Sequence, residues 1–225
     1  MNTHRRTAII VGTLFIIGTV VLISSGVFSE SIHSPDYLNA VAANQNNVIT
    51  AALIELISAA AIVGIPIALY PYLKRYSQSL SVGYLTARIF EVVFLVAGTV
   101  IMLTLLSLSQ EYVASASTAS TFYGSAGALL LATRGWCGIL LDFPFTISAV
   151  ILNYVFLKTL LVPKWLSVWG IIGAALWLAL APLRLFGFET PMIEVLALPI
   201  AAQEMALAVW LIVKGFKVTN HEPRI

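Results

Sequence analysis

The sequence has few charged residues and almost no cysteine, and both shortages restrict what the chain can be. Of its 225 residues only 10% are charged, whereas a soluble globular domain carries about 25%. The single cysteine, Cys137, excludes an intramolecular disulfide and a thiolate cluster. The three histidines, His4, His33 and His221, all fall outside the long apolar blocks. We therefore expect no metal site and no cofactor.

The sequence also lacks the short motifs that usually indicate an activity. It contains no phosphate-binding loop, no dinucleotide fingerprint, no HExxH, no paired CxxC and no GxSxG elbow. No run of lysine and arginine is long enough to indicate nucleic-acid binding. Nucleic acid is therefore not expected as a partner, and no catalytic residue can be named.

What the sequence has in abundance is long apolar blocks. Hydrophobic residues make up 60% of the chain, and the mean hydropathy is +0.96. Since about 20 apolar residues cross a bilayer as a helix, the blocks predict an all-α integral membrane bundle of six transmembrane helices. The lipid bilayer is then its principal partner. The expected spans cover about residues 7–28, 48–72, 81–108, 129–157, 165–186 and 192–213, within a single transmembrane domain over residues 1–225.

Three segments can adopt more than one structure as judged from their sequence. The first apolar block is longer than the core of a signal peptide, which has 7–15 residues, so we expect it to remain as a span. The polar segment 29–47 contains Asp36–Asn44, which can form a short surface helix. Residues 109–133 are rich in serine, threonine and alanine. They can form a connection with a re-entrant or interfacial helix, or part of the fourth span.

The basic residues predict the orientation of the spans. With six spans, nearly all lysines and arginines outside the spans lie on one side, which the positive-inside rule makes cytoplasmic. Both termini are then cytoplasmic. These residues are Arg5, Arg6, Lys74, Arg75, Lys158, Lys164, Lys214, Lys217 and Arg224.

Charged residues inside the spans are the best candidates for a functional site. Arg88 and Glu91 lie three residues apart on one helix face, and a charge in hydrocarbon costs several kcal/mol unless it is paired or faces a polar cavity. At about 1.5 Å per helical residue, Glu91 and Glu204 both lie roughly 15 Å from the inner boundary. We therefore expect a midplane cluster of Arg88, Glu91, Glu204 and Gln203.

A second layer of charge is expected closer to the outer surface. Glu55 and Asp142 each lie roughly 24 Å from the inner boundary by the same count, and Arg134 and Arg184 are their natural partners. If both layers converge, they line a polar cavity open to the outside. The candidate ligand-binding residues are Glu55, Arg88, Glu91, Arg134, Asp142, Gln203 and Glu204.

Three functions remain open on this evidence. The first is binding or transport of a small polar or amphipathic molecule, or of a lipid, through the outward-facing cavity. The second is an accessory or scaffold subunit whose buried charges only specify helix packing. The third is a membrane-embedded enzyme in which a carboxylate with a raised pKa acts as general acid or base. Because carboxylates inside a membrane are costly, binding or transport is the preferred interpretation, and the scaffold and the enzyme are alternatives to it.

Four segments resemble a known family. They are Ala68–Pro71, Arg134–Trp136, Leu161–Gly170 and Leu198–Met205. Together they are similar to a membrane family called domain of unknown function 4386, over nearly the whole chain from Thr7 to Phe216. The resemblance implies several spans, no assigned activity, and residence in the plasma membrane of a bacterium or archaeon. The family often has an acidic residue after the arginine of the second segment, where this chain has Gly135.

Overall fold

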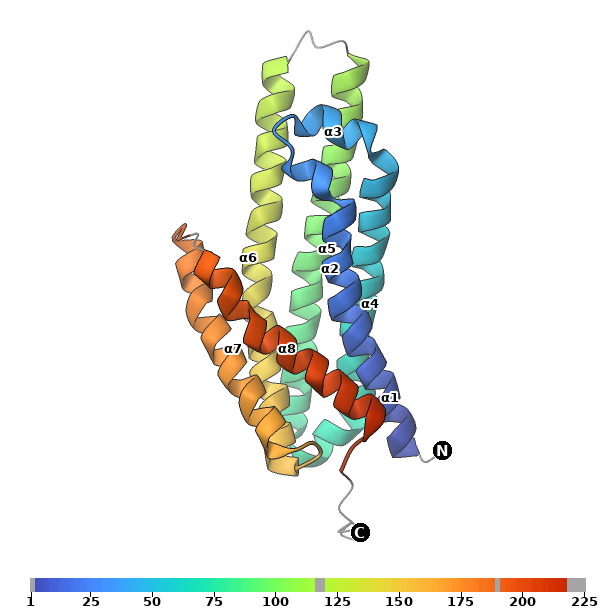
Figure 1. Ribbon diagram of the computed structural model, residues 1–225, viewed down its shortest axis with the longest axis vertical. Helices are drawn as coiled ribbons and strands as arrows, with labels where there is room; N and C mark the ends of the chain where they lie inside the picture. The colour runs from blue at the N-terminus through green and yellow to red at the C-terminus, as the bar shows by residue number, and fades with distance from the viewer. Residues whose placement is uncertain (1–2, 116–119, 189–190, 218–225) are drawn as a thin grey trace. The chain divides into compact units, whose positions relative to one another are not determined.

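The computed structural model describes residues 3–115, 120–188 and 191–217, and every regular element in these residues is a helix (Figure 1). The all-α prediction is therefore confirmed for the part of the chain that the structure describes. The elements, in chain order, are α1 (Thr3–Ile16), the π-helical turn η1 (Ile17–Val21), α2 (Leu22–Phe28), the 3-10 turn η2 (Glu30–His33), α3 (Tyr37–Ala43), α4 (Gln45–Tyr76), α5 (Gln78–Ala114), α6 (Ser120–Thr159), α7 (Lys164–Leu185) and α8 (Pro191–Val213).

Five helical stretches among the described residues are long and apolar enough to cross a membrane. They are Thr3–Phe28, Gln45–Tyr76, Gln78–Ala114, Thr121–Thr159 and Lys164–Leu185. A shorter apolar stretch, Leu198–Val213, lies within α8. Large apolar side chains such as Ile23, Ile67 and Leu129 are exposed on these helices, as expected where the solvent is lipid and not water. The chain is a multi-pass helical membrane protein.

The chain divides into two compact units. The first unit takes in the described parts of Met1–Ile16, Ile62–Ile89 and Asp142–Ile225, and the second takes in Ile17–Ala61 and the described part of Phe90–Leu141. The long helices α4, α5 and α6 contribute residues to both units. The single transmembrane domain expected from the sequence stays a prediction.

In the first unit α8 lies beside both α7 and α1 (Figure 1). Small residues allow these close approaches. A Cβ atom on Gly12 of α1 would lie 2.6 Å from the carbonyl oxygen of Ala208, and one on Gly173 of α7 would lie 3.1 Å from the backbone of Ile200. The core of this unit includes Phe15, Leu69, Tyr84, Phe156, Leu166 and Leu211, all almost fully buried.

The second unit has its own core, formed by α3 with parts of α4, α5 and α6. Its buried apolar residues include Val41, Val48, Ala51, Met102 and Leu105. The hydroxyl of Tyr37 donates a hydrogen bond of 2.9 Å to the carbonyl of Gly124 on α6. The short helix α3 confirms the helix expected within Asp36–Asn44.

Of the alternatives left open for residues 109–133, the described residues favour a continuation of the long helices. Helix α5 continues to Ala114, and Ser120 begins α6, so residues 120–133 belong to the helix of the fourth span. No re-entrant or separate interfacial helix forms in residues 120–133. With 37 and 40 residues, the two helices are about 56 and 60 Å long. Since the hydrocarbon core is about 30 Å thick, both extend beyond it, and their polar ends can be helical in water.

The first expected span is also not one regular helix. Between α1 and α2 the residues Ile17–Val21 form a π-helical turn, which accommodates one residue more than an α-helical turn. The division between the two units falls at the start of this turn.

Candidate functional site

The first ion pair lies in the first unit and joins α5 to α8. The Nη2 atom of Arg88 is 3.1 Å from Oε1 of Glu204, and the two residues are only 2% and 7% exposed. Three aromatic rings surround the guanidinium group, with centroids 5.9 Å (Phe15), 5.7 Å (Tyr84) and 5.5 Å (Phe145) from its Cζ atom. The negative ring faces attract the cation, so rings and carboxylate together compensate a charge that water cannot reach.

Gln203, next to Glu204 on α8, forms a separate polar cluster in the same unit. Its Nε2 atom donates to Oδ1 of Asn153 (3.1 Å) and to the carbonyl of Leu166 (3.2 Å). Asn153 in turn donates to the carbonyl of Ala149 at 2.9 Å. Within the described residues, the Oε1 atom of Gln203 and the hydroxyl of Ser167 are buried and have no hydrogen-bond partner. The Oε1 atom of Gln203 is therefore an acceptor that no described residue uses, and the same holds for the hydroxyl of Ser167, the residue after Leu166.

The second ion pair of the first unit joins α6 to α7. Arg184 donates from Nη1 to Oδ2 of Asp142. The Cζ atom of Arg184 lies 5.6 Å from the ring centroid of Trp177. Asp142 is buried, while the side chain of Arg184 keeps 31% of its surface exposed. Asp142 is thus paired with one of the two arginines that the depth count offers to Glu55 and Asp142 jointly.

The third ion pair lies in the second unit and joins α4, α5 and α6. The Nη2 atom of Arg134 is 2.5 Å from Oε1 of Glu55, and its Nη1 atom donates to the carbonyl of Gly98 at 2.6 Å. The hydroxyl of Thr99 donates to the other oxygen of Glu55 at 2.5 Å. Both carboxylate oxygens therefore accept a hydrogen bond, and Glu55 is buried.

The seven candidate residues are divided between the units. Arg88, Asp142, Gln203 and Glu204 belong to the first unit, and Glu55, Glu91 and Arg134 to the second. Glu91 is buried on α5, but its place in a cluster with Arg88 and Glu204 stays a prediction. The single cavity lined by all seven also stays a prediction.

Sequence reasoning missed several members of these sites. Thr99 and Asn153 are ordinary polar residues in apolar spans, and only the rotation of the helices makes them partners of Glu55 and Gln203. Gly170 on α7 could have indicated a close contact at this point, because a side chain there would collide with Asn153. Arg5, which counted only as a basic loop residue, donates to the carbonyls of Leu211 (3.1 Å) and Ile212 (2.5 Å) at the end of α8.

The geometry bears directly on the possible chemistry. The Thr99 hydroxyl next to Glu55 has the composition of a nucleophile and a base, but both residues are buried and Glu55 is occupied by Arg134. Among the described residues, no group of three or more His, Cys, Asp and Glu residues is placed to hold a metal ion. Each of these three ion pairs connects one helix to another within the apolar helical stretches.

Comparison with known proteins gives one match. The family model described as domain of unknown function (DUF4386) matches residues 10–215, which is most of the chain. No curated protein matches the chain. No solved structure matches it either.

Proposed function

The chain belongs to the DUF4386 family, and we propose that it is an accessory or scaffold protein of the membrane, whose buried charges hold its helices in fixed positions. The observation that supports this is the pairing of the carboxylates Glu55, Asp142 and Glu204. Each is buried, and each is bonded to an arginine from another helix. A carboxylate that already has an arginine partner gains little from a ligand cation.

The proposal includes six spans with both termini in the cytoplasm and residence in the plasma membrane. Helix α8 has 23 residues and is therefore about 34 Å long, which is enough to cross a hydrocarbon core of about 30 Å. With α8 as a sixth span, the basic residues of the loops lie on one side, as the positive-inside rule requires for cytoplasmic termini.

Buried ion pairs suit a structural role because breaking them is costly. Removing one partner leaves an uncompensated charge and destabilises a protein by about 3–5 kcal/mol, whereas replacing both partners by apolar residues is often neutral or stabilising. Such pairs therefore contribute to one correct arrangement of the helices more than to total stability. In hydrocarbon the penalty for a wrong helix register is the exposure of a charge to lipid.

The test uses the full chain extracted from its native membrane in polymer nanodiscs. We expect a second protein at fixed stoichiometry in the purified particle. We also expect the double variant Arg88→Met with Glu204→Met to keep that partner, because the pair is structural. A particle that contains this chain alone, with a small molecule at fixed stoichiometry that the double variant loses, would refute the scaffold role.

A second candidate function is binding of a small polar molecule at the Gln203 cluster. The specific observation is the pair of buried, unused groups there, Oε1 of Gln203 and the hydroxyl of Ser167. Unpaired buried polar groups cost about 1–3 kcal/mol each, so a polar guest or a water that bonds to either of them would be stabilising. Mass spectrometry of small molecules released from the wild type and from Ser167→Ala tests this. A guest is expected to be lost with Ser167→Ala, and an identical, empty profile from both proteins would exclude it.

A further inference from the structure

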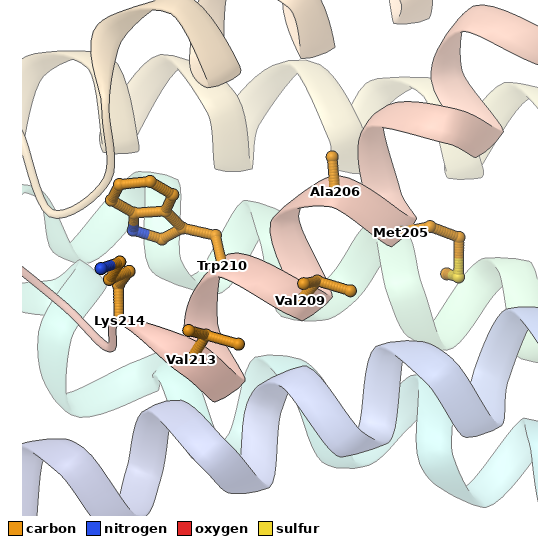
Figure 2. Close-up of a pocket in the computed structure, with 6 residues that line it drawn as sticks. All are labelled: Met205, Ala206, Val209, Trp210, Val213 and Lys214. Atoms are coloured by element: carbon orange, nitrogen blue, oxygen red, sulfur yellow. The ribbon is translucent and has the colours of Figure 1, made fainter.

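A shallow groove runs along the C-terminal half of α8. It has a volume of about 450 Å³ and is lined by Met205, Ala206, Val209, Trp210, Val213 and Lys214 (Figure 2). These residues form two ridges at a spacing of four, 205–209–213 and 206–210–214, which lie next to each other on one helix surface. Every lining residue comes from α8 or the residue directly after it. The groove is therefore open along its length.

The groove is apolar along its length and positively charged at one end. Val209 and Val213 are 55% and 60% exposed, and the ammonium group of Lys214 closes the end. A second exposed lysine lies beside it, since Nζ of Lys217 is 5.8 Å from the ring centroid of Trp210. An occupant must accordingly combine an apolar body with an anionic head.

The length of the groove matches one leaflet of a bilayer. From Met205 to Lys214 the helix rises about 13 Å, and half of a hydrocarbon core of about 30 Å is about 15 Å. A tryptophan and two lysines at its end are the residues typical of the membrane interface. A compact water-soluble ligand would need further polar groups along the walls, and besides Lys214 the lining side chains supply only the indole N–H of Trp210, which is buried.

We propose that this groove binds an anionic phospholipid, with one acyl chain along Met205, Val209 and Val213 and the phosphate at Lys214 and Lys217. The inference rests on the part of the proposed function that makes α8 a membrane span, but not on the scaffold role. Each lysine near an anionic headgroup contributes about 1 kcal/mol, which corresponds to about fivefold in affinity.

The test titrates the full chain with phosphatidylglycerol or phosphatidylcholine and counts retained lipids by native mass spectrometry. Phosphatidylglycerol is expected to be retained preferentially, and Lys214→Gln and Lys217→Gln each to weaken its binding about fivefold. The matched control is Lys74→Gln, which removes another exposed lysine whose Nζ atom lies 5.5 Å from the ring centroid of Tyr70. Equal retention of the two lipids, or an equal loss in Lys74→Gln, would overturn the proposal.

A second pair of variants tests the groove separately from the charges. Val209→Trp fills the groove and is expected to reduce phosphatidylglycerol retention, while Leu198→Trp on the exposed surface of the same helix leaves it unchanged. Unchanged binding in Val209→Trp would show that the lysines act without the groove and would overturn the proposed site. A nitroxide on Val209→Cys, in a Cys137→Ala background, reports independently whether α8 is in lipid, through its accessibility to oxygen against a water-soluble nickel reagent.

Discussion

Two of the buried arginines are stabilised by different surroundings. One belongs to the ion pair of the second unit, and the other to the α5–α8 pair of the first unit. Arg134 in the second unit donates to the carboxylate of Glu55 and to the carbonyl of Gly98, and Thr99 completes the bonding of Glu55. Arg88 in the first unit bonds to Glu204 in a surround of three aromatic rings. Arg134 thus donates to a carboxylate and to a backbone carbonyl, whereas Arg88 donates to a carboxylate and lies among three aromatic rings.

The difference predicts how each pair responds to the loss of a partner. The side chain of Arg134 is 20% exposed, whereas that of Arg88 is 3% exposed. Arg134 can therefore keep part of its hydration and its bond to Gly98 when Glu55 is gone. The α5–α8 pair has little access to solvent, so an uncompensated charge there is more costly.

The largest effect is expected for Arg88→Met. Glu204 is left buried without its arginine, and the free energy of unfolding should fall by about 3–5 kcal/mol. Unfolding by dodecyl sulfate in mixed micelles measures this change. The double variant with Glu204→Met should recover most of the loss. If the double variant is as unstable as Arg88→Met, the stability is lost with the ion pair itself and not through the uncompensated charge of Glu204.

A smaller effect is expected for Glu55→Gln in the second unit. The neutral amide loses the charged hydrogen bonds of the carboxylate, which are worth about 1.5–3 kcal/mol, while Arg134 keeps the carbonyl of Gly98. The same unfolding titration measures it. Glu111→Gln serves as the control, because Glu111 is exposed on α5 and its loss should not change stability. If Glu55→Gln costs as much as Arg88→Met, the two sites do not differ in the way described.

Thr99→Val is expected to destabilise the protein by about 1 kcal/mol. Valine keeps the shape of threonine but cannot donate to Glu55, which still has Arg134. The matched control is Thr104→Val, since Thr104 is exposed and bonds only to the carbonyl of Val100 in the same helix. Equal effects of the two substitutions would mean that Thr99 contributes nothing to the pair.

The smallest effect concerns one ring beside Arg88. Phe145→Leu should cost about 0.5–1 kcal/mol more in the wild type than in the Arg88→Met, Glu204→Met background, since the cation–ring attraction exists only in the first. A double-mutant cycle on the same unfolding titration isolates this coupling. A coupling energy of zero would mean that the ring of Phe145 contributes packing only and no attraction to the cation.

The sequence was sufficient for part of this site because charge and depth are both readable from it. Counting residues from the span ends placed Glu91 and Glu204 at comparable depths with Arg88 nearby, and it offered Arg134 and Arg184 as partners for Glu55 and Asp142 without assigning one to the other. Helix rotation cannot be counted in this way. Thr99, Asn153 and the rings of Phe15 and Phe145 meet their partners only because particular helix faces turn toward each other.

The helix ends show a second limit of prediction. Hydropathy marks where hydrocarbon ends, but a helix can continue into water wherever its residues tolerate it, as α5 and α6 do through much of 109–133. The π-helical turn at Ile17–Val21 has no counterpart in the hydropathy of the first block. Spans are therefore more predictable than the helices that contain them.

The contact of Arg5 with the end of α8 also has a consequence for biogenesis. Arg5 and Leu211 are 206 positions apart in the sequence, so α1 is completed by a helix that is synthesised much later. Until α8 is synthesised, the face of α1 that carries Gly12 has no Ala208 to pack against. Insertion of the earlier spans can proceed during translation, but closure of the first unit must wait until α8 has been synthesised. In a nascent chain that stops before α8, the face of α1 that carries Gly12 therefore stays exposed to membrane quality-control factors.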